Sequence, residues 1–160
     1  MIATPMQSPP KRNRKETPLS SRPVTVGSFL EQTVFNAMLD PASSLGIKTV
    51  YKCNGLWADG YFRRDDEAQV PFEIKTTLGW QQLATGVFQI LSLNQFKSLG
   101  APEGWLIYEK VSDAWSEKNI AYPLQEAWYC LSEIHTHLPI KLCQLVPGVG
   151  LVVQSAPTAA

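Results

Sequence analysis

The segment that most constrains the fold is "VPFEIKTTLGWQQ", from Val70 to Gln82, in which an apolar, strand-like stretch leads directly into helical sequence. In an extended chain, residues two apart point to the same face. Glu73 and Lys75 therefore share one face of the predicted strand, and Ile74 lies on the other. An exposed ion pair, worth about 0–1 kcal/mol, is one interpretation. The other is a pair of functional charges at the end of a packed strand.

The sequence before this strand predicts a helix and the first part of a β-hairpin. Ser28 and Glu31 have the form of a capping box, apolar residues then recur at helical spacing, and Asp40-Pro41 ends the helix. β-branched and aromatic residues predict one or two strands over about residues 47–62. The charged segment "RRDDEAQ" then forms a turn, so the strand over residues 70–77 should pair back as an antiparallel hairpin.

Helices and strands continue to alternate toward the C-terminus. We expect a second helix that stops at Gly100, a short buried strand over residues 104–111 and a third helix over residues 124–137. The segments "IKLCQLV" and "GLVVQ", joined by Pro147-Gly148, predict a final hairpin. This order predicts an α/β fold in which helices flank a mixed central sheet.

Length and composition fit a single domain, expected over residues 24–155 of the 160-residue chain. The three cysteines are far apart and form no CxxC pair, which predicts a reducing compartment rather than disulfides or a zinc site. The sequence has no run of about 18 apolar residues, and its N-terminus lacks the apolar stretch of a signal peptide. We therefore expect no membrane partner and a cytoplasmic location, or a nuclear one in a eukaryotic host.

The two ends of the chain differ in composition from this domain. Residues 1–23 are rich in Pro, Ser and Thr without apolar periodicity, so we expect a disordered tail, and residues 156–160 are expected to be a frayed end. The tail contains the basic cluster "KRNRK", whose charged members are Lys11, Arg12, Arg14 and Lys15. Such a cluster is typical of an arm that binds nucleic acid or of a targeting signal. A solubilising tail without a specific partner explains it equally well.

Asp59 is the residue that gives Glu73 a second interpretation, because it lies 14 residues earlier, at the end of the preceding predicted strand. Folding the hairpin about the charged turn brings the two carboxylates to neighbouring strands. Two close carboxylates with water are typical ligands of Mg²⁺, and without a cation they repel each other. Lys75 could then orient or help deprotonate the water that attacks a phosphodiester.

Asp59 followed by Glu73-Ile74-Lys75 resembles the D…ExK signature of the PD-(D/E)xK phosphodiesterase superfamily, which includes restriction endonucleases, Holliday-junction resolvases and recombination exonucleases. The resemblance covers about residues 28–108 and agrees in element order with the restriction endonuclease-like core of that superfamily: a helix, a three-stranded meander, a helix and a further strand. It implies a nuclease that hydrolyses DNA with Mg²⁺ or Mn²⁺. It also implies that Asp59, Glu73 and the backbone carbonyl of Ile74 bind the metal.

The resemblance further implies assisting residues. A glutamate on the first helix often assists, and Glu31 matches that place. Members similar to RecB-type nucleases have a glutamine on the helix after the lysine, for which Gln81, Gln82 and Gln89 are candidates; we select Gln82. The aromatic residue that follows this glutamine by four positions in those members has no counterpart here, and Ala58 replaces the proline common before the first Asp. No subgroup is therefore assigned.

Contacts to DNA are expected from Arg63, Arg64 and the basic cluster, with binding that weakens steeply with salt. A homodimer or a larger complex is left open. Purely structural roles also explain these residues, because Asp-Gly at Asp59 is a turn signal and helix capping alone explains Glu31. Two other functions are compatible with the sequence: a nuclease-like domain without activity that acts as a nucleic-acid-binding or assembly subunit, and a protein-binding scaffold.

Overall fold

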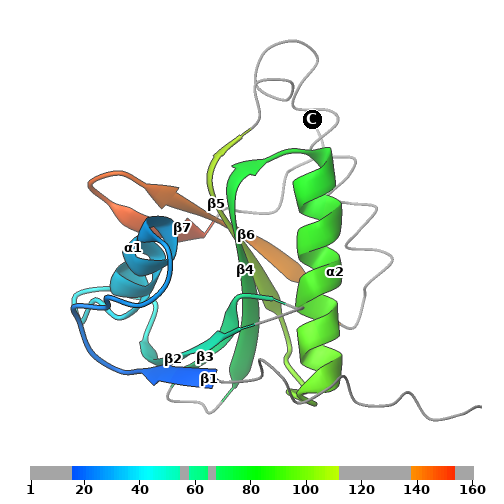
Figure 1. Cartoon of the computed structure of the whole chain (residues 1–160), viewed down its shortest axis with the longest axis horizontal. Helices are drawn as coiled ribbons and strands as arrows, with labels where there is room; N and C mark the ends of the chain where they lie inside the picture. Colours follow the sequence, from blue (N-terminus) through cyan, green and yellow to red (C-terminus); the bar gives the residue numbers. More distant parts are fainter. Residues whose placement is uncertain (1–15, 55–57, 65–67, 112–137, 154–160) are drawn as a thin grey trace, which may run out of the picture.

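The computed structural model describes residues 16–54, 58–64, 68–111 and 138–153. Within these ranges the chain forms a mixed seven-stranded sheet and two helices, and the strands follow one another across the sheet in chain order (Figure 1). The predicted α/β class is confirmed. Neither helix in these ranges has the length and apolar character needed to cross a membrane. The third predicted helix lies outside the described residues.

Helix α1 spans Phe29–Met38 and begins where the capping box predicts. The hydroxyl of Ser28 accepts a hydrogen bond from the backbone N–H of Glu31, and the Glu31 carboxylate accepts one from the N–H of Ser28, both at 3.2 Å. These two bonds satisfy donors that a helix N-terminus otherwise leaves unpaired. The buried face of the helix consists of Val34, Phe35 and Met38.

Three antiparallel strands follow: β2 (Ile47–Cys53), β3 (Gly60–Arg64) and β4 (Gln69–Leu78). Residues 47–62 thus form two strands rather than one, and the predicted hairpin across the charged turn is confirmed. In its register Gly60 pairs with Phe72. The residue before Gly60 and the residue after Phe72 therefore lie on neighbouring strands.

Helix α2 (Trp80–Phe96) returns the chain to the other end of the sheet, so that β5 (Gly104–Val111) pairs parallel with β4. The helix ends before the predicted stop, because Ser98 and Gly100 adopt positive φ values of 49° and 61° that turn the chain. α2 packs very closely on the sheet at Gly104, where an added Cβ would lie 2.4 Å from Ile90 Cγ2.

The sheet ends with β6 (Ile140–Val146), parallel to β5, and β7 (Gly150–Val153), antiparallel to β6. The predicted C-terminal hairpin is therefore confirmed. The positive φ of Gly148, 76°, lies in the turn between the two strands.

The opposite edge of the sheet corrects one prediction. We expected residues 1–23 to be a disordered tail, but Glu16–Leu19 forms strand β1, which pairs antiparallel with β2. The segment contains Pro18 and lacks a clear apolar alternation, so its sequence does not predict a strand. An edge strand tolerates such a sequence because it is held mainly by backbone bonds to its one neighbour. The folded part of the chain thus begins earlier than the expected boundary at residue 24.

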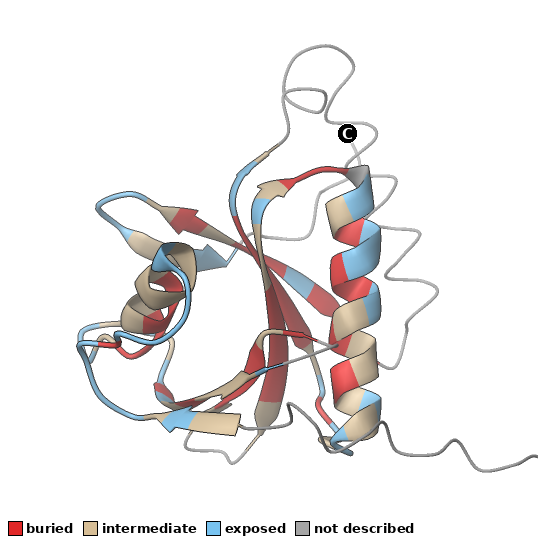
Figure 2. Ribbon diagram, in the orientation of Figure 1, coloured by how far each residue is buried: buried red, intermediate tan, exposed pale blue. Residues whose placement is uncertain are grey.

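Side chains pack on both faces of the sheet, with α1 on one face and α2 on the other (Figures 1 and 2). Phe72 and Ile74 of β4 belong to the core under α1. Because side chains alternate along a strand, Glu73 and Lys75 face α2. The charges that the sequence singled out therefore lie between the sheet and this helix.

Candidate active site

The register of β3 and β4 places Asp59 beside Glu73, and Gly60 makes the close packing around them feasible. A Cβ at Gly60 would lie 2.2 Å from the backbone oxygen of Tyr51 on β2 and 3.0 Å from the ring of Phe72 on β4. Only a residue without a side chain fits between these neighbours. The Asp-Gly pair is thus part of a strand entry rather than only a turn signal.

Two reciprocal hydrogen bonds hold Asp59 against β4. The backbone N–H of Asp59 donates to Glu73 Oε1 at 3.0 Å, and the backbone N–H of Ile74 donates to Asp59 Oδ2 at 2.7 Å. Each carboxylate is therefore oriented by the backbone of the other strand. The sequence predicted that these two side chains would meet, and the structure brings them together.

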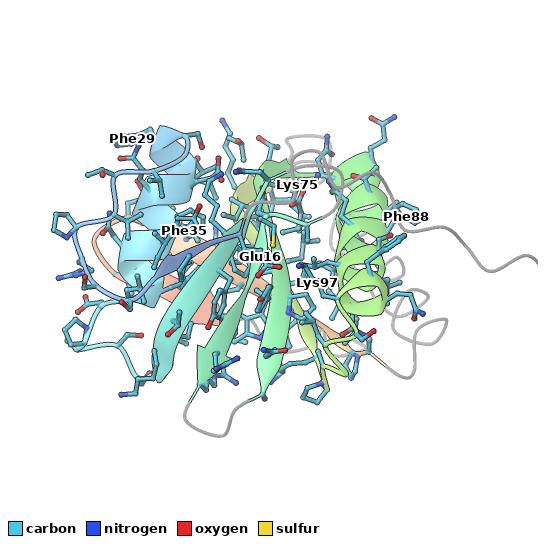
Figure 3. The ribbon with its side chains drawn as sticks, turned by 60° about the horizontal axis from the view of Figure 1, so that its bottom comes forward. Glu16, Phe29, Phe35, Lys75, Phe88 and Lys97 are labelled. Carbon is cyan, nitrogen blue, oxygen red and sulfur yellow. The ribbon has the colours of Figure 1, made fainter. Side chains whose placement is uncertain are left out.

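Lys75 completes the group of charges. Its Nζ lies 3.0 Å from Glu73 Oε2 and donates a hydrogen bond to Gln89 Oε1 of α2 at 2.8 Å. The strand and the helix thus both determine where this ammonium group lies. We name the four side chains Asp59, Glu73, Lys75 and Gln89 the carboxylate–lysine cluster; Figure 3 shows Lys75 in the space between the sheet and α2.

Glu73 is the one charged side chain among the described residues that is buried, with 4% of its surface exposed. Burial raises the pKa of its carboxyl group well above the usual range. Hydrogen bonding with the Asp59 carboxylate and repulsion by that carboxylate raise the pKa further, and the nearby Lys75 lowers it only in part. A buried anion beside a second carboxylate is costly unless another positive charge is present.

The donors in the carboxylate–lysine cluster fit a hard divalent cation. Asp59 and Glu73 supply carboxylate oxygens, and the carbonyl of Ile74 lies between Glu73 and Lys75 in the chain. In the described ranges no third His, Cys, Asp or Glu joins them. Any cation there would take its remaining ligands from backbone and water, as Mg²⁺ commonly does.

The helix glutamine in this cluster is Gln89, not the Gln82 that we selected from the sequence. Within the described part of the chain, Lys75 forms a hydrogen bond with Gln89 and none with Gln82. The two glutamines lie seven residues apart on one helix, so the sequence alone shows them on a similar face. The register of α2 on β4, which is a tertiary property, decides between them.

Glu31 has other partners than the residues of the carboxylate–lysine cluster. Its carboxylate caps α1 at Ser28 and lies 3.6 Å from Nζ of Lys52, which also donates to Asn54 at 2.7 Å. Lys52 pairs in the sheet with Gly60, the residue after Asp59. Glu31 is therefore connected to the strand entry through Lys52, but it makes no contact with Asp59 or Glu73 in the described residues.

The two arginines expected to contact DNA lie toward the far end of β3 from Asp59, roughly 13–16 Å along the strand. Arg64 donates to the carbonyl of Leu45, pairs with Glu103 at 3.2 Å and lies over aromatic rings. Arg63 lies over the ring of Tyr51, 5.7 Å from its centroid. The structure does not bring them to the carboxylates. The basic cluster of residues 11–15 lies outside the described residues.

Comparison with known proteins adds no relative to this geometry: no protein-family model, no curated protein and no solved structure matches the chain.

Proposed function

We propose that the chain is a metal-dependent phosphodiester hydrolase of the PD-(D/E)xK superfamily that acts on DNA. The observation that supports this most directly is the reciprocal hydrogen bonding between Asp59 and the Glu73-Ile74 segment, beside Lys75. A structural ion pair would need only Glu73 and Lys75. The additional carboxylate, oriented by the backbone of β4, is what the nuclease motif requires.

The arrangement of the elements gives independent support. α1, the antiparallel strands β2 to β4, α2 and β5 follow in the order expected of a restriction endonuclease-like core. The carboxylates lie at the entry of its second strand and within its third. This is the place in the meander where the D…ExK signature predicts them.

Asp59, Glu73 and the carbonyl of Ile74 would hold a bound Mg²⁺ or Mn²⁺, which would supply Lewis-acid stabilisation of charge on the phosphoryl oxygens. The residues of the chain have their own tasks. The Lys75 ammonium has three N–H donors, of which Glu73 and Gln89 occupy two. The third can orient the attacking water or donate to a phosphate oxygen, and Gln89 fixes the direction in which it points.

The test is metal-dependent cleavage of labelled single-stranded, duplex and branched DNA by the purified chain. Glu73→Ala and Lys75→Ala should each lower the cleavage rate by at least about a hundredfold, because the first removes a metal ligand and the second removes the ammonium group beside the attacking water and the phosphate. The matched control is Glu109→Ala with Lys110→Ala, which removes the same two charges from exposed positions on β5. Cleavage that survives Glu73→Ala unchanged would refute the proposal.

A second candidate is a nuclease-like subunit that binds nucleic acid or assembles with other chains without cleaving. One observation favours it: both carboxylate oxygens of Glu73 already have partners, the Asp59 N–H and Lys75. A cluster whose carboxylate oxygens already have partners within the protein can act as a structural link between β3 and β4. Binding of DNA without metal-dependent cleavage in the same assay would support this candidate.

A further inference from the structure

Two tyrosines form a stacked pair on the face of the sheet that carries the carboxylates. Tyr51 of β2 and Tyr61 of β3 are partners in the sheet register, and their ring centroids lie 4.7 Å apart with the ring planes inclined by 16°. Both rings pack with the core on the α2 side of the sheet. The main contacts of α2 are with β4 and β5, so β2 and β3 extend beyond the strands that this helix covers.

Polar contacts fix the ring of Tyr61. Its hydroxyl donates to Glu16 Oε2 of β1 at 2.8 Å, and Lys97, just after α2, forms an ion pair with Glu16 Oε1. Figure 3 shows Glu16 and Lys97 close together, in the space between sheet and helix that also holds Lys75. Tyr61 is therefore a rigid support for the ring of Tyr51.

Tyr51 is the accessible member of the pair. It is half-buried, whereas Tyr61 exposes only 7% of its surface. Its ring contacts among the described residues come from β3: Tyr61, and Arg63, whose guanidinium carbon lies 5.7 Å from the Tyr51 centroid. On the side of β1, the register partner of Tyr51 is the exposed Pro18. Pro18, Tyr51 and Tyr61 thus form a row of flat, apolar side chains across three strands.

This row lies next to the row that contains the carboxylates. Glu16 pairs with Cys53, whose N–H donates to the carbonyl of Asp59 at 2.8 Å. Asp59 in turn lies beside Glu73. Tyr61 follows Asp59 by two residues, so the aromatic row and the acidic row are about 7 Å apart on one face of the sheet.

Arg63 continues this order, two residues beyond Tyr61 on β3. Its Nε is buried and has no hydrogen-bond partner in the part of the chain that the structure describes. Arg64, by contrast, pairs with Glu103 and with the carbonyl of Leu45. An unpaired buried donor is costly, and phosphate oxygens are acceptors that match the donors of arginine. The face therefore presents carboxylates, tyrosines and an arginine in sequence, as a nucleotide strand presents a phosphodiester, a base and the next phosphate.

We propose that Tyr51, supported by Tyr61 and flanked by Arg63, is a stacking site for an unpaired nucleobase next to the phosphodiester held at Asp59 and Glu73. This inference rests on the proposed function and specifies its substrate as DNA whose bases are unpaired at the cleavage position. A base inside a duplex is already stacked on its neighbours, so only a single-stranded or splayed base can use a protein ring. Stacking accepts every base, so the site selects strand structure rather than sequence.

The first test measures stacking separately from cleavage. In a Glu73→Gln background, which blocks the proposed cleavage, Tyr51→Ala is compared with Tyr51→Trp, which retains a flat ring, and with Phe88→Ala. Phe88 is 65% exposed and lies on the outer side of α2, away from the sheet (Figure 3). The probes are a fluorescently labelled single strand of about 20 nucleotides and the duplex of the same sequence.

Tyr51→Ala should weaken binding of the single strand at least about fivefold, because it removes the ring on which the base stacks. Tyr51→Trp and Phe88→Ala should each bind within about twofold of the parent, and Tyr51→Ala should change duplex binding by less than about twofold. The salt dependence should be the same for Tyr51→Ala and the parent, because stacking neutralises no phosphate.

Arg63→Gln tests the neighbouring phosphate contact. It should reduce the salt slope of single-strand binding by about 0.7, the value for one phosphate on a single strand. Lys141→Gln is the control, because it removes an exposed cation of β6 whose register partner, Trp105, packs on the opposite face of the sheet. Its salt slope should equal that of the parent.

Equal losses for Tyr51→Ala and Tyr51→Trp, equal effects on single strand and duplex, or no binding of the single strand by the parent would overturn the inference. Circular dichroism and thermal unfolding show whether each variant is folded. If Tyr51→Ala does not fold, Tyr51→Leu retains apolar packing against Tyr61 without an aromatic face and should show the same loss of binding.

Cleavage by the protein with native Glu73 decides the proposed function in a separate assay. There Tyr51→Ala should raise KM for the single strand at least about fivefold, because the base contact is present before and during the reaction. A protein that stacks an unpaired base but never cleaves would refute the function. A protein that cleaves the single strand with a KM unchanged by Tyr51→Ala would refute the inference.

Discussion

At the scale of single residues, Glu73 is where burial and charge oppose each other most strongly. Its folded-state pKa is raised by burial and by Asp59, so the stability that its protonated form contributes is fully present below the usual pKa of 4.5 and is lost as pH rises through the raised value. Glu73→Gln abolishes this titration. In metal-free buffer, the free energy of unfolding of the variant relative to the parent should therefore increase between about pH 5 and pH 9, by about 1–3 kcal/mol.

Urea unfolding with a chelator, at three pH values, measures this difference. The control is Glu109→Gln, which neutralises a carboxylate on an exposed part of β5 and should change the free energy of unfolding by less than about 0.5 kcal/mol. A difference between Glu73→Gln and the parent that stays constant across the range would show that Glu73 is ionised at no net cost in the folded protein.

Gln89 allows a second prediction at this scale, because Gln82 is a matched control on the same helix. Gln89→Leu removes the acceptor that orients Lys75, while Gln82→Leu removes a side chain that, among the described residues, forms no hydrogen bond with Lys75. One hydrogen bond of about 1–1.5 kcal/mol corresponds to roughly a five- to tenfold lower cleavage rate for Gln89→Leu. Gln82→Leu should cleave at the parental rate. Equal rates for both variants would show that the helix glutamine does not position the lysine.

At the scale of elements, Gly60 allows the close packing of β2, β3 and β4 on which the position of Asp59 depends. Gly60→Ala places a Cβ against the backbone oxygen of Tyr51, which cannot rotate away. The strand entry must therefore shift, and we expect a loss of about 2–4 kcal/mol in the free energy of unfolding together with weaker Mg²⁺ binding. Thermal unfolding and metal titration measure the two effects.

Gly86→Ala is the control for this substitution. The three atoms nearest to its Cβ would all belong to the Leu106 side chain, with Cδ1 at 2.5 Å, and this side chain can move. Alanine also favours the helix by about 1 kcal/mol over glycine, so the net change should stay within about 1 kcal/mol. If the two alanine variants were equally destabilised, close backbone packing at Gly60 would not be what positions Asp59.

The elements also show what the sequence can and cannot predict. The cap at Ser28, the hairpin before Glu73 and the turn at Gly148 depend on neighbouring residues, and all three were predicted correctly. The meeting of Asp59 and Glu73 was predicted because the hairpin alone brings them together. Strand β1 was missed, because its partners, β2 in the sheet and the side chains of Tyr61 and Lys97, all lie far along the chain.

The same distinction explains the individual site residues. The hydrogen bond of Lys75 to Gln89, and not to the selected Gln82, follows from the register of α2 on the sheet, which no local pattern determines. Arg64 looked available for DNA in the sequence, but its partners Leu45 and Glu103 lie 19 and 39 residues away. The periodicity and spacing of residues in the sequence therefore do not predict contacts that depend on the packing of distant elements.

At the scale of the whole molecule, a cation at the carboxylate–lysine cluster should act on folding, because it binds residues that only the folded hairpin brings together. A ligand that binds only the folded state, at a concentration about a hundredfold above its Kd, stabilises by about 2.7 kcal/mol. Mg²⁺ should therefore raise the Tm of the parent protein in a concentration-dependent way. Asp59→Asn should remove most of this rise, because it removes one of the two carboxylates.

The pH dependence of this effect separates specific binding from general screening by salt. Glu73, whose pKa is raised, must lose its proton to hold a cation, so Mg²⁺ affinity and the Tm rise should both increase with pH. Calorimetric titration in two buffers of different ionisation enthalpy measures the proton released. Sodium chloride at equal ionic strength is the control. A Tm rise that sodium chloride reproduces, or that Asp59→Asn retains, would show that the two carboxylates form a structural link between β3 and β4 and do not bind the metal.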